Sequence, residues 1–80
     1  MSIARVLAVD DRRENLLALQ AILEGLPIEI ESVTSGEDAL KRLLTGDYAV
    51  ILLDAHMPGM DGFETAGHVK QRERTRHIPI

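Results

Sequence analysis

The sequence predicts an α/β domain built around a small parallel sheet, and three observations support this fold class. Short apolar runs alternate with stretches whose leucines recur at helical spacing, in the order β-α-β-α-β-α. Ala49–Leu53 is continuously apolar, as strands buried on both faces of a parallel sheet are. Ile28–Glu31 alternates apolar and charged residues, which is typical of an edge strand. If the first strand lies between these two, the spatial order is 2-1-3.

The first strand and helix are predicted within residues 3–27. Ile3–Val9 is apolar apart from Arg5 and ends at Asp10-Asp11. Asp11 and Glu14 have the spacing of a capping box, which predicts that a helix begins at Asp11. The apolar stripe of this helix consists of Leu16, Leu19, Leu23 and Leu26. The residues expected to end the helix are Gly25 and Pro27.

The next two helices carry similar signals. Ser35 and Asp61 are the expected capping residues, and Gly67 weakens the third helix by about 1 kcal/mol. Ile78-Pro79-Ile80 reads as the first residues of a fourth strand. The apolar stripe of the second helix consists of Ala39, Leu40, Leu43 and Leu44, and Gly46 closes this helix. Tyr48 and Phe63 are expected to be packing residues.

Parallel strands joined by right-handed helical crossovers fix which face each helix covers. The winding reverses between the first and third strands, so the first helix covers one face and the other two helices cover the opposite face. Nothing after residue 77 is long enough to flank the third strand fully. We therefore expect an open strand edge that favours a homodimer or a domain-swapped assembly.

Composition excludes several classes of function. The chain has 80 residues, a net charge of −4 and two aromatic residues, which argues against direct binding of nucleic acid. It has no cysteine, so neither a disulfide nor a thiolate metal site is possible. The longest apolar runs are too short to span a membrane, and we expect a cytoplasmic protein with no membrane contact.

Three carboxylates are the strongest candidates for chemistry. Asp10 and Asp11 follow the first strand, and Asp54 follows the third. These strands flank the point where the winding reverses, which is where such sheets bind ligands. Clustered carboxylates suit Mg²⁺ or Mn²⁺, and one of them could attack a phosphoryl group. Helix capping explains only one member of the aspartate pair, and Asp54 read alone could be an ordinary turn residue.

A longer motif sharpens this interpretation. Residues 54–62 resemble the phosphoacceptor loop of response-regulator receiver domains, which are CheY-like proteins of two-component signalling. The Asp10-Asp11 pair and the stretch Thr34–Leu40 resemble the same family. The resemblance implies a flavodoxin-like, three-layer fold with strand order 2-1-3-4-5. Residues 1–80 would then be the N-terminal part of a single receiver domain, an incomplete sheet with a strand stub.

The resemblance also implies residue roles. Asp54 would accept a phosphoryl group from a sensor histidine kinase or a phosphotransfer protein in a phosphorelay. Asp11 would bind Mg²⁺ directly, and Asp10 would act through water. The position of His56 implies a ligand through its backbone carbonyl and a side chain that influences dephosphorylation. The residues that shape the loop would be Met57, Pro58, Gly59 and Gly62.

The family's Ser or Thr on the fourth strand and its Lys on the fifth would lie after Ile80, so we expect impaired phosphorylation. Two alternatives to a phosphoacceptor remain at this point. The chain could instead be a non-phosphorylated interaction half-domain that self-assembles through its third strand. A phosphatase with an aspartyl nucleophile typically has a second acid two residues later, where this sequence has His56. We therefore expect a phosphoryl acceptor rather than a turnover enzyme.

Overall fold

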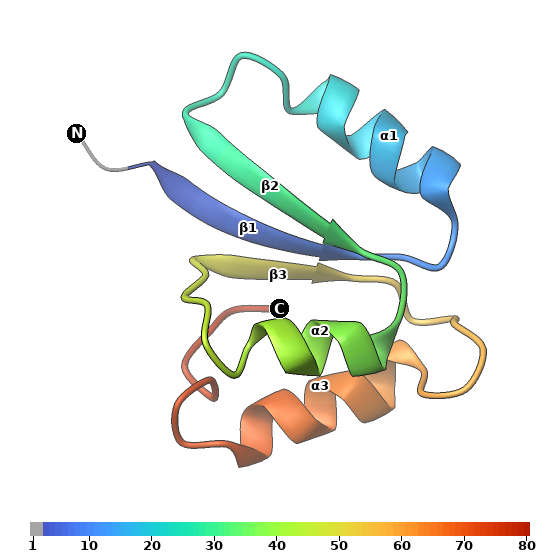
Figure 1. The fold of residues 1–80 in the computed structure, drawn as a ribbon, viewed down its shortest axis with the longest axis vertical. Helices are drawn as coiled ribbons and strands as arrows, with labels where there is room; N and C mark the ends of the chain where they lie inside the picture. Colours follow the sequence, from blue (N-terminus) through green and yellow to red (C-terminus); the bar gives the residue numbers. More distant parts are fainter. Residues whose placement is uncertain (1–2) are drawn as a thin grey trace.

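The computed structural model describes residues 3–80 and confirms the α/β fold class (Figure 1). Each strand is followed by a helix, and the sheet is parallel throughout. The strand order is β2-β1-β3, as the sequence predicts, with β1 at the centre. The six elements are β1 (Ala4–Val9), α1 (Arg13–Ile22), β2 (Ile28–Val33), α2 (Gly36–Arg42), β3 (Val50–Leu53) and α3 (Gly62–Gln71).

The hydrophobic core lies on one face of the sheet, beneath α2 and α3. Figure 1 shows these two helices on one side of the strands and α1 on the other. Leu7 and Ile51, which are register partners on β1 and β3, are almost completely buried in this core. The core cluster consists of Leu7, Val9, Val33, Ala39, Leu40, Leu43, Tyr48, Ile51, Met57, Val69 and Ile78.

The opposite face is covered much less. Leu16 is the one buried residue of α1. It lies on the face of the sheet to which Val6 and Ala8 of β1 belong, opposite the face of Leu7 and Val9. Leu17 and Ile22 on the same helix are exposed, and Leu52 on β3 is 36% exposed. The apolar stripe of α1 therefore docks on the sheet mainly at its first turns.

Two of the three predicted helix caps are confirmed. The Ser35 side chain accepts a hydrogen bond from the Asp38 N–H at 3.0 Å, and Asp61 accepts one from the Glu64 N–H at 2.8 Å. The prediction that Asp11 caps α1 is wrong, because the N-cap is Arg12 and makes no side-chain cap bond. The Asp10 carboxylate accepts the Arg12 N–H at 3.0 Å instead, so the turn is closed one residue earlier.

Three predicted apolar contacts are also wrong. Leu26 and Leu44 are exposed because α1 ends at Ile22 and α2 ends at Arg42, before either residue is reached. Phe63 is 75% exposed on the first turn of α3, whereas Tyr48 is buried as expected. The apolar stripes of α1 and α2 are therefore shorter than the sequence predicts.

The predicted fourth strand is present only as a single contact. Residues 78–80 are not in a strand, yet the Ile51 N–H donates to the Pro79 carbonyl at 2.9 Å. Ile78 is buried in the core cluster beside this bond. Most of the outer edge of β3 has no strand against it within residues 3–80. Self-association through that edge stays a prediction.

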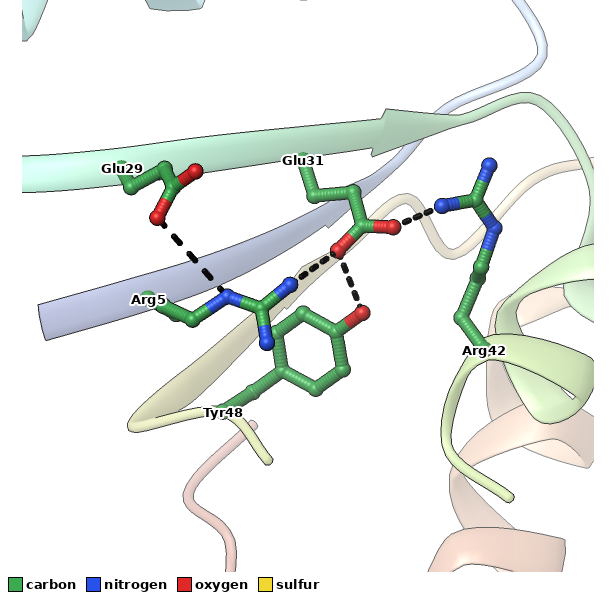
Figure 2. Close-up of polar contacts among 5 residues, drawn as sticks. All are labelled: Arg5, Glu29, Glu31, Arg42 and Tyr48. Carbon is green, nitrogen blue, oxygen red and sulfur yellow. Dashed lines mark hydrogen bonds and ion pairs between the residues drawn. The ribbon is translucent and has the colours of Figure 1, made fainter. Parts of the chain in front are cut away.

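A polar cluster joins β1, β2 and α2 with Tyr48, which precedes β3. Figure 2 shows Glu31 of β2 accepting from Arg5 of β1, Arg42 of α2 and the Tyr48 hydroxyl. The Arg5–Glu31 distance is 2.8 Å, and the Arg5 guanidinium lies 4.9 Å from the centre of the Tyr48 ring. Glu31 is the common acceptor, so the three donors depend on one side chain.

Replacing Glu31 with alanine should lower the free energy of unfolding by about 1–2 kcal/mol, because three donors lose their acceptor. The loss is moderate since the Arg5 and Arg42 side chains are 42% and 54% exposed. Glu29→Ala is the matched control: Glu29 lies on the same strand and reaches Arg5 only at 3.9 Å. We expect it to change stability by less than about 0.5 kcal/mol in urea unfolding. Equal losses in the two variants would contradict this account.

Candidate functional site

The three predicted carboxylates meet at the carboxyl ends of β1 and β3. Val9 and Leu53 are register partners, so the next residues, Asp10 and Asp54, emerge side by side. The Asp54 N–H donates to the Val9 carbonyl at 3.0 Å, which fixes this alignment. One carboxylate oxygen from each of Asp10, Asp11 and Asp54 lies within 4.8 Å of the others. The predicted clustering of these residues is therefore present.

The aspartates differ in their surroundings. Asp10 and Asp54 are half-buried and Asp11 is exposed. Both Asp10 oxygens accept hydrogen bonds, one from the Arg12 N–H at 3.0 Å and one from the Asn15 side chain at 3.1 Å. Asp54 accepts the His56 N–H at 3.2 Å. The contact from Asn15 was missed in the sequence, where an asparagine on the first helical turn gives no distinct signal.

This donor set fits a small, hard divalent cation. Carboxylate oxygens are the ligands that Mg²⁺ takes in proteins, usually together with several waters. The side chains converge from two neighbouring strand ends, and the exposure of Asp11 leaves the cluster open to solvent. Three negative charges this close repel one another, so a bound cation would relieve an unfavourable interaction.

The loop after Asp54 returns to the backbone of Asp54 and Ala55. Gly59 has φ +73°, a conformation that glycine adopts without strain, and Met57 is buried in the core. A Cβ atom on Gly62 would collide with the Asp54 carbonyl oxygen and would lie 2.7 Å from Ala55 Cα. Pro58 is exposed between these residues. The loop therefore turns at Gly59 and returns to pack α3 against the end of β3.

His56 is exposed in the loop, and its backbone N–H faces the Asp54 carboxylate. Its carbonyl as a metal ligand and its side chain as an influence on dephosphorylation stay predictions.

Two hollows lie near the carboxyl ends of the strands. A hollow of about 250 Å³ is lined by both Asp10 and Asp54, together with Asn15, Leu16 and Leu52. A larger one of about 500 Å³ lies between α1 and α2 and is not lined by any of the three aspartates.

Comparison with known proteins gives a consistent result. A family profile described as "Response regulator receiver domain" matches residues 6–80. The chain is 38% identical over 79 residues to the sensor histidine kinase GacS of Pseudomonas protegens, covering 95% of this chain and 9% of that protein. It is 40% identical over 77 residues to the response regulator PleD of Caulobacter vibrioides, covering 96% and 17%. The chain thus spans less than a fifth of these curated relatives.

Solved structures show the same likeness. The chemotaxis response regulator CheY4 of Vibrio cholerae superposes with a TM-score of 0.91 at 32% identity, covering 99% of this chain and 66% of that one. The response regulator TrrA of Thermotoga maritima, solved in complex with Mg²⁺-BeF, gives a TM-score of 0.84 at 35% identity, covering 90% of this chain and 63% of that one.

None of the helices in residues 3–80 has the length and apolar character needed to cross a bilayer.

Proposed function

The chain belongs to the family of response regulator receiver domains of two-component signalling, and from this premise we propose that Asp54 is its phosphoacceptor. A carboxylate oxygen of Asp54 would attack the phosphorus of a phosphohistidine. The P–N bond then breaks and an acyl phosphate forms, so the chain is a phosphoryl acceptor rather than a turnover enzyme. The observation that carries the proposal is the convergence of Asp10, Asp11 and Asp54 at one edge of the sheet.

The surroundings of Asp54 support its role over those of the other two aspartates. It ends β3, and the His56 N–H already orients one of its oxygens. Close packing of Gly62 against the Asp54 carbonyl holds the backbone beneath it. Asp10 has two donors of its own, and Asp11 is the most exposed of the three.

We propose that Mg²⁺, or Mn²⁺ in its place, binds beside Asp54. Asp11, Asp54 and the His56 carbonyl would be direct ligands, and Asp10 would act through a water molecule. The cation would supply positive charge opposite the transferring phosphoryl oxygens. The relative TrrA, whose structure was solved with Mg²⁺-BeF, supports this choice of metal.

The proposed donor is a sensor histidine kinase or a phosphotransfer protein of the cytoplasm. The similarity to GacS and PleD supports this class of partner. We further propose that residues 1–80 form the N-terminal part of one receiver domain, because the matched solved receivers are longer than the part that aligns. The loop shape set by Met57, Pro58, Gly59 and Gly62 is proposed to present Asp54 to the donor.

The test is intact-mass spectrometry after incubation with acetyl phosphate, with and without Mg²⁺. We expect one phosphoryl adduct on the wild-type chain that requires Mg²⁺, and we expect its loss in Asp54→Asn. Asp61→Asn is the matched control, because Asp61 is an exposed aspartate of the same loop that caps α3. Asparagine caps helices as well as aspartate does, so this variant should still be phosphorylated.

Two results would overturn the proposal. One is an adduct that persists unchanged in Asp54→Asn. The other is the absence of any adduct on wild-type protein that circular dichroism shows to be folded.

A further inference from the structure

The Asp10 carboxylate is held at both oxygens by the corner between β1 and α1. One oxygen accepts the Arg12 N–H at 3.0 Å. The other accepts the Asn15 Nδ2 donor at 3.1 Å. Arg12 donates through its backbone, which any residue except proline could supply, whereas the second bond depends on the side chain at position 15. Asn15 is therefore the one side chain of α1 shown to bind the acidic cluster.

We propose that Asn15 is a positioning residue for the metal site, acting through Asp10. This inference rests on the proposed function, because it concerns the same three carboxylates. A carboxylate has about four lone-pair positions, and the two donors use one on each oxygen. The remaining positions of Asp10 are free to accept hydrogen bonds from a water molecule on the cation. Such outer-shell hydrogen bonds orient ligands and tune metal affinity.

The electrostatics of the cluster favour the same role. Asp10, Asp11 and Asp54 bring their carboxylate oxygens within 4.8 Å, so the orientation of Asp10 decides how strongly the three charges repel. A neutral amide donor stabilises the negative charge of Asp10 through a hydrogen bond and does not add a positive side chain that would compete with the cation. An arginine or lysine at position 15 would bind Asp10 more tightly and would repel Mg²⁺.

A simpler role for Asn15 is to stabilise the start of α1, since Arg12 makes no side-chain cap bond and Leu16 is the helix's one buried residue. The two roles predict different results. A helix-stabilising residue changes the unfolding of the metal-free chain and leaves the affinity for Mg²⁺ unchanged. A positioning residue lowers the affinity for Mg²⁺ even when the metal-free chain remains folded.

Isothermal titration of Mg²⁺ into the full chain distinguishes these roles. We expect Asn15→Ala to weaken binding about tenfold, the lower end of what loss of an outer-shell partner causes. Asn15→Gln keeps an amide donor and should recover most of the affinity. Gln20→Ala is the matched control, because Gln20 is an exposed amide of α1 whose bond goes to Ser32 at 3.2 Å, away from the cluster. It should bind Mg²⁺ as the wild type does.

The variants are expected to fold, because Asn15 is exposed and alanine favours helix. Urea unfolding of each metal-free variant verifies this, and Asn15→Ser provides a second truncation with the same expected tenfold loss. Wild-type affinity in a folded Asn15→Ala or Asn15→Ser chain would overturn the inference. Failure of the wild-type chain to bind Mg²⁺ would instead overturn the metal site of the proposed function.

Discussion

Gly62→Ala is expected to destabilise the chain by about 3 kcal/mol, the upper end of what overpacking usually costs. The added methyl group would collide with the Asp54 carbonyl oxygen and would press on Ala55 Cα at 2.7 Å. Both neighbours are backbone atoms, so no side chain can rotate to make room. Either α3 moves away from the sheet or the backbone beneath Asp54 shifts, and each outcome also distorts the acidic cluster.

Gly67 offers a control of opposite sign. It lies within α3, and a Cβ atom there would meet nothing within 4 Å. Gly67→Ala should therefore stabilise the chain by about 1 kcal/mol through helix propensity and a less flexible unfolded state. Urea unfolding followed by far-ultraviolet circular dichroism measures both changes. Stabilisation by alanine at both positions would show that Gly62 does not pack as closely as described.

Leu7→Ala is expected to cost about 2–5 kcal/mol, a large fraction of the stability of a chain this small. Leu7 lies on the central strand and is 0% exposed, in the core between the sheet and the α2–α3 layer. Its removal leaves a cavity bordered by residues of β3 and of the helices, which cannot all relax into the space. We expect a lower urea midpoint and partial unfolding at 37 °C.

Leu52→Ala tests whether the core has only one side. Leu52 lies on the adjacent strand, opposite Ala8 in register, and is 36% exposed on the face that α1 covers sparsely. Truncation there should cost about 1 kcal/mol or less, because much of the side chain already contacts water. A loss as large as that of Leu7→Ala would mean that both faces of the sheet contribute equally to stability.

The sequence was sufficient to predict the sheet and the acidic cluster, for a physical reason. The alternation of Ile28–Glu31 and the continuously apolar run Ala49–Leu53 predict different surroundings for two of the strands, and this difference places the first strand between them, as the structure does. Parallel strands bring their carboxyl ends to one edge, so Asp10 and Asp54 had to be neighbours once the order was known. Residues 54–62 could be recognised by their resemblance to receiver domains, and two of the glycines in this stretch, Gly59 and Gly62, meet backbone constraints in the structure.

Features that depend on competition between nearby groups could not be predicted. Asp11 has the spacing of a cap, but Asp10 reaches the Arg12 N–H first. Leu44 fits the predicted helical stripe but lies beyond the end of α2, and Phe63, an expected packing residue, is exposed. The hydrogen bonds to Glu31 come from residues up to 26 positions away, and no local pattern connects them. Asn15 has the same limitation, because its partner lies across the turn.

The sparse docking of α1 connects cation binding at the acidic cluster with the local stability of this helix. Because Leu16 is the one buried residue of α1, we expect this helix to leave the sheet at a lower free-energy cost than α2 or α3, whose buried residues belong to the core. Asp10, Asp11 and Asn15 lie at the joint where α1 begins. A cation that binds only the docked form would shift this local equilibrium in proportion to its concentration. The fraction of chains in which α1 is docked on the sheet would then rise with the fraction of acidic clusters that hold a cation.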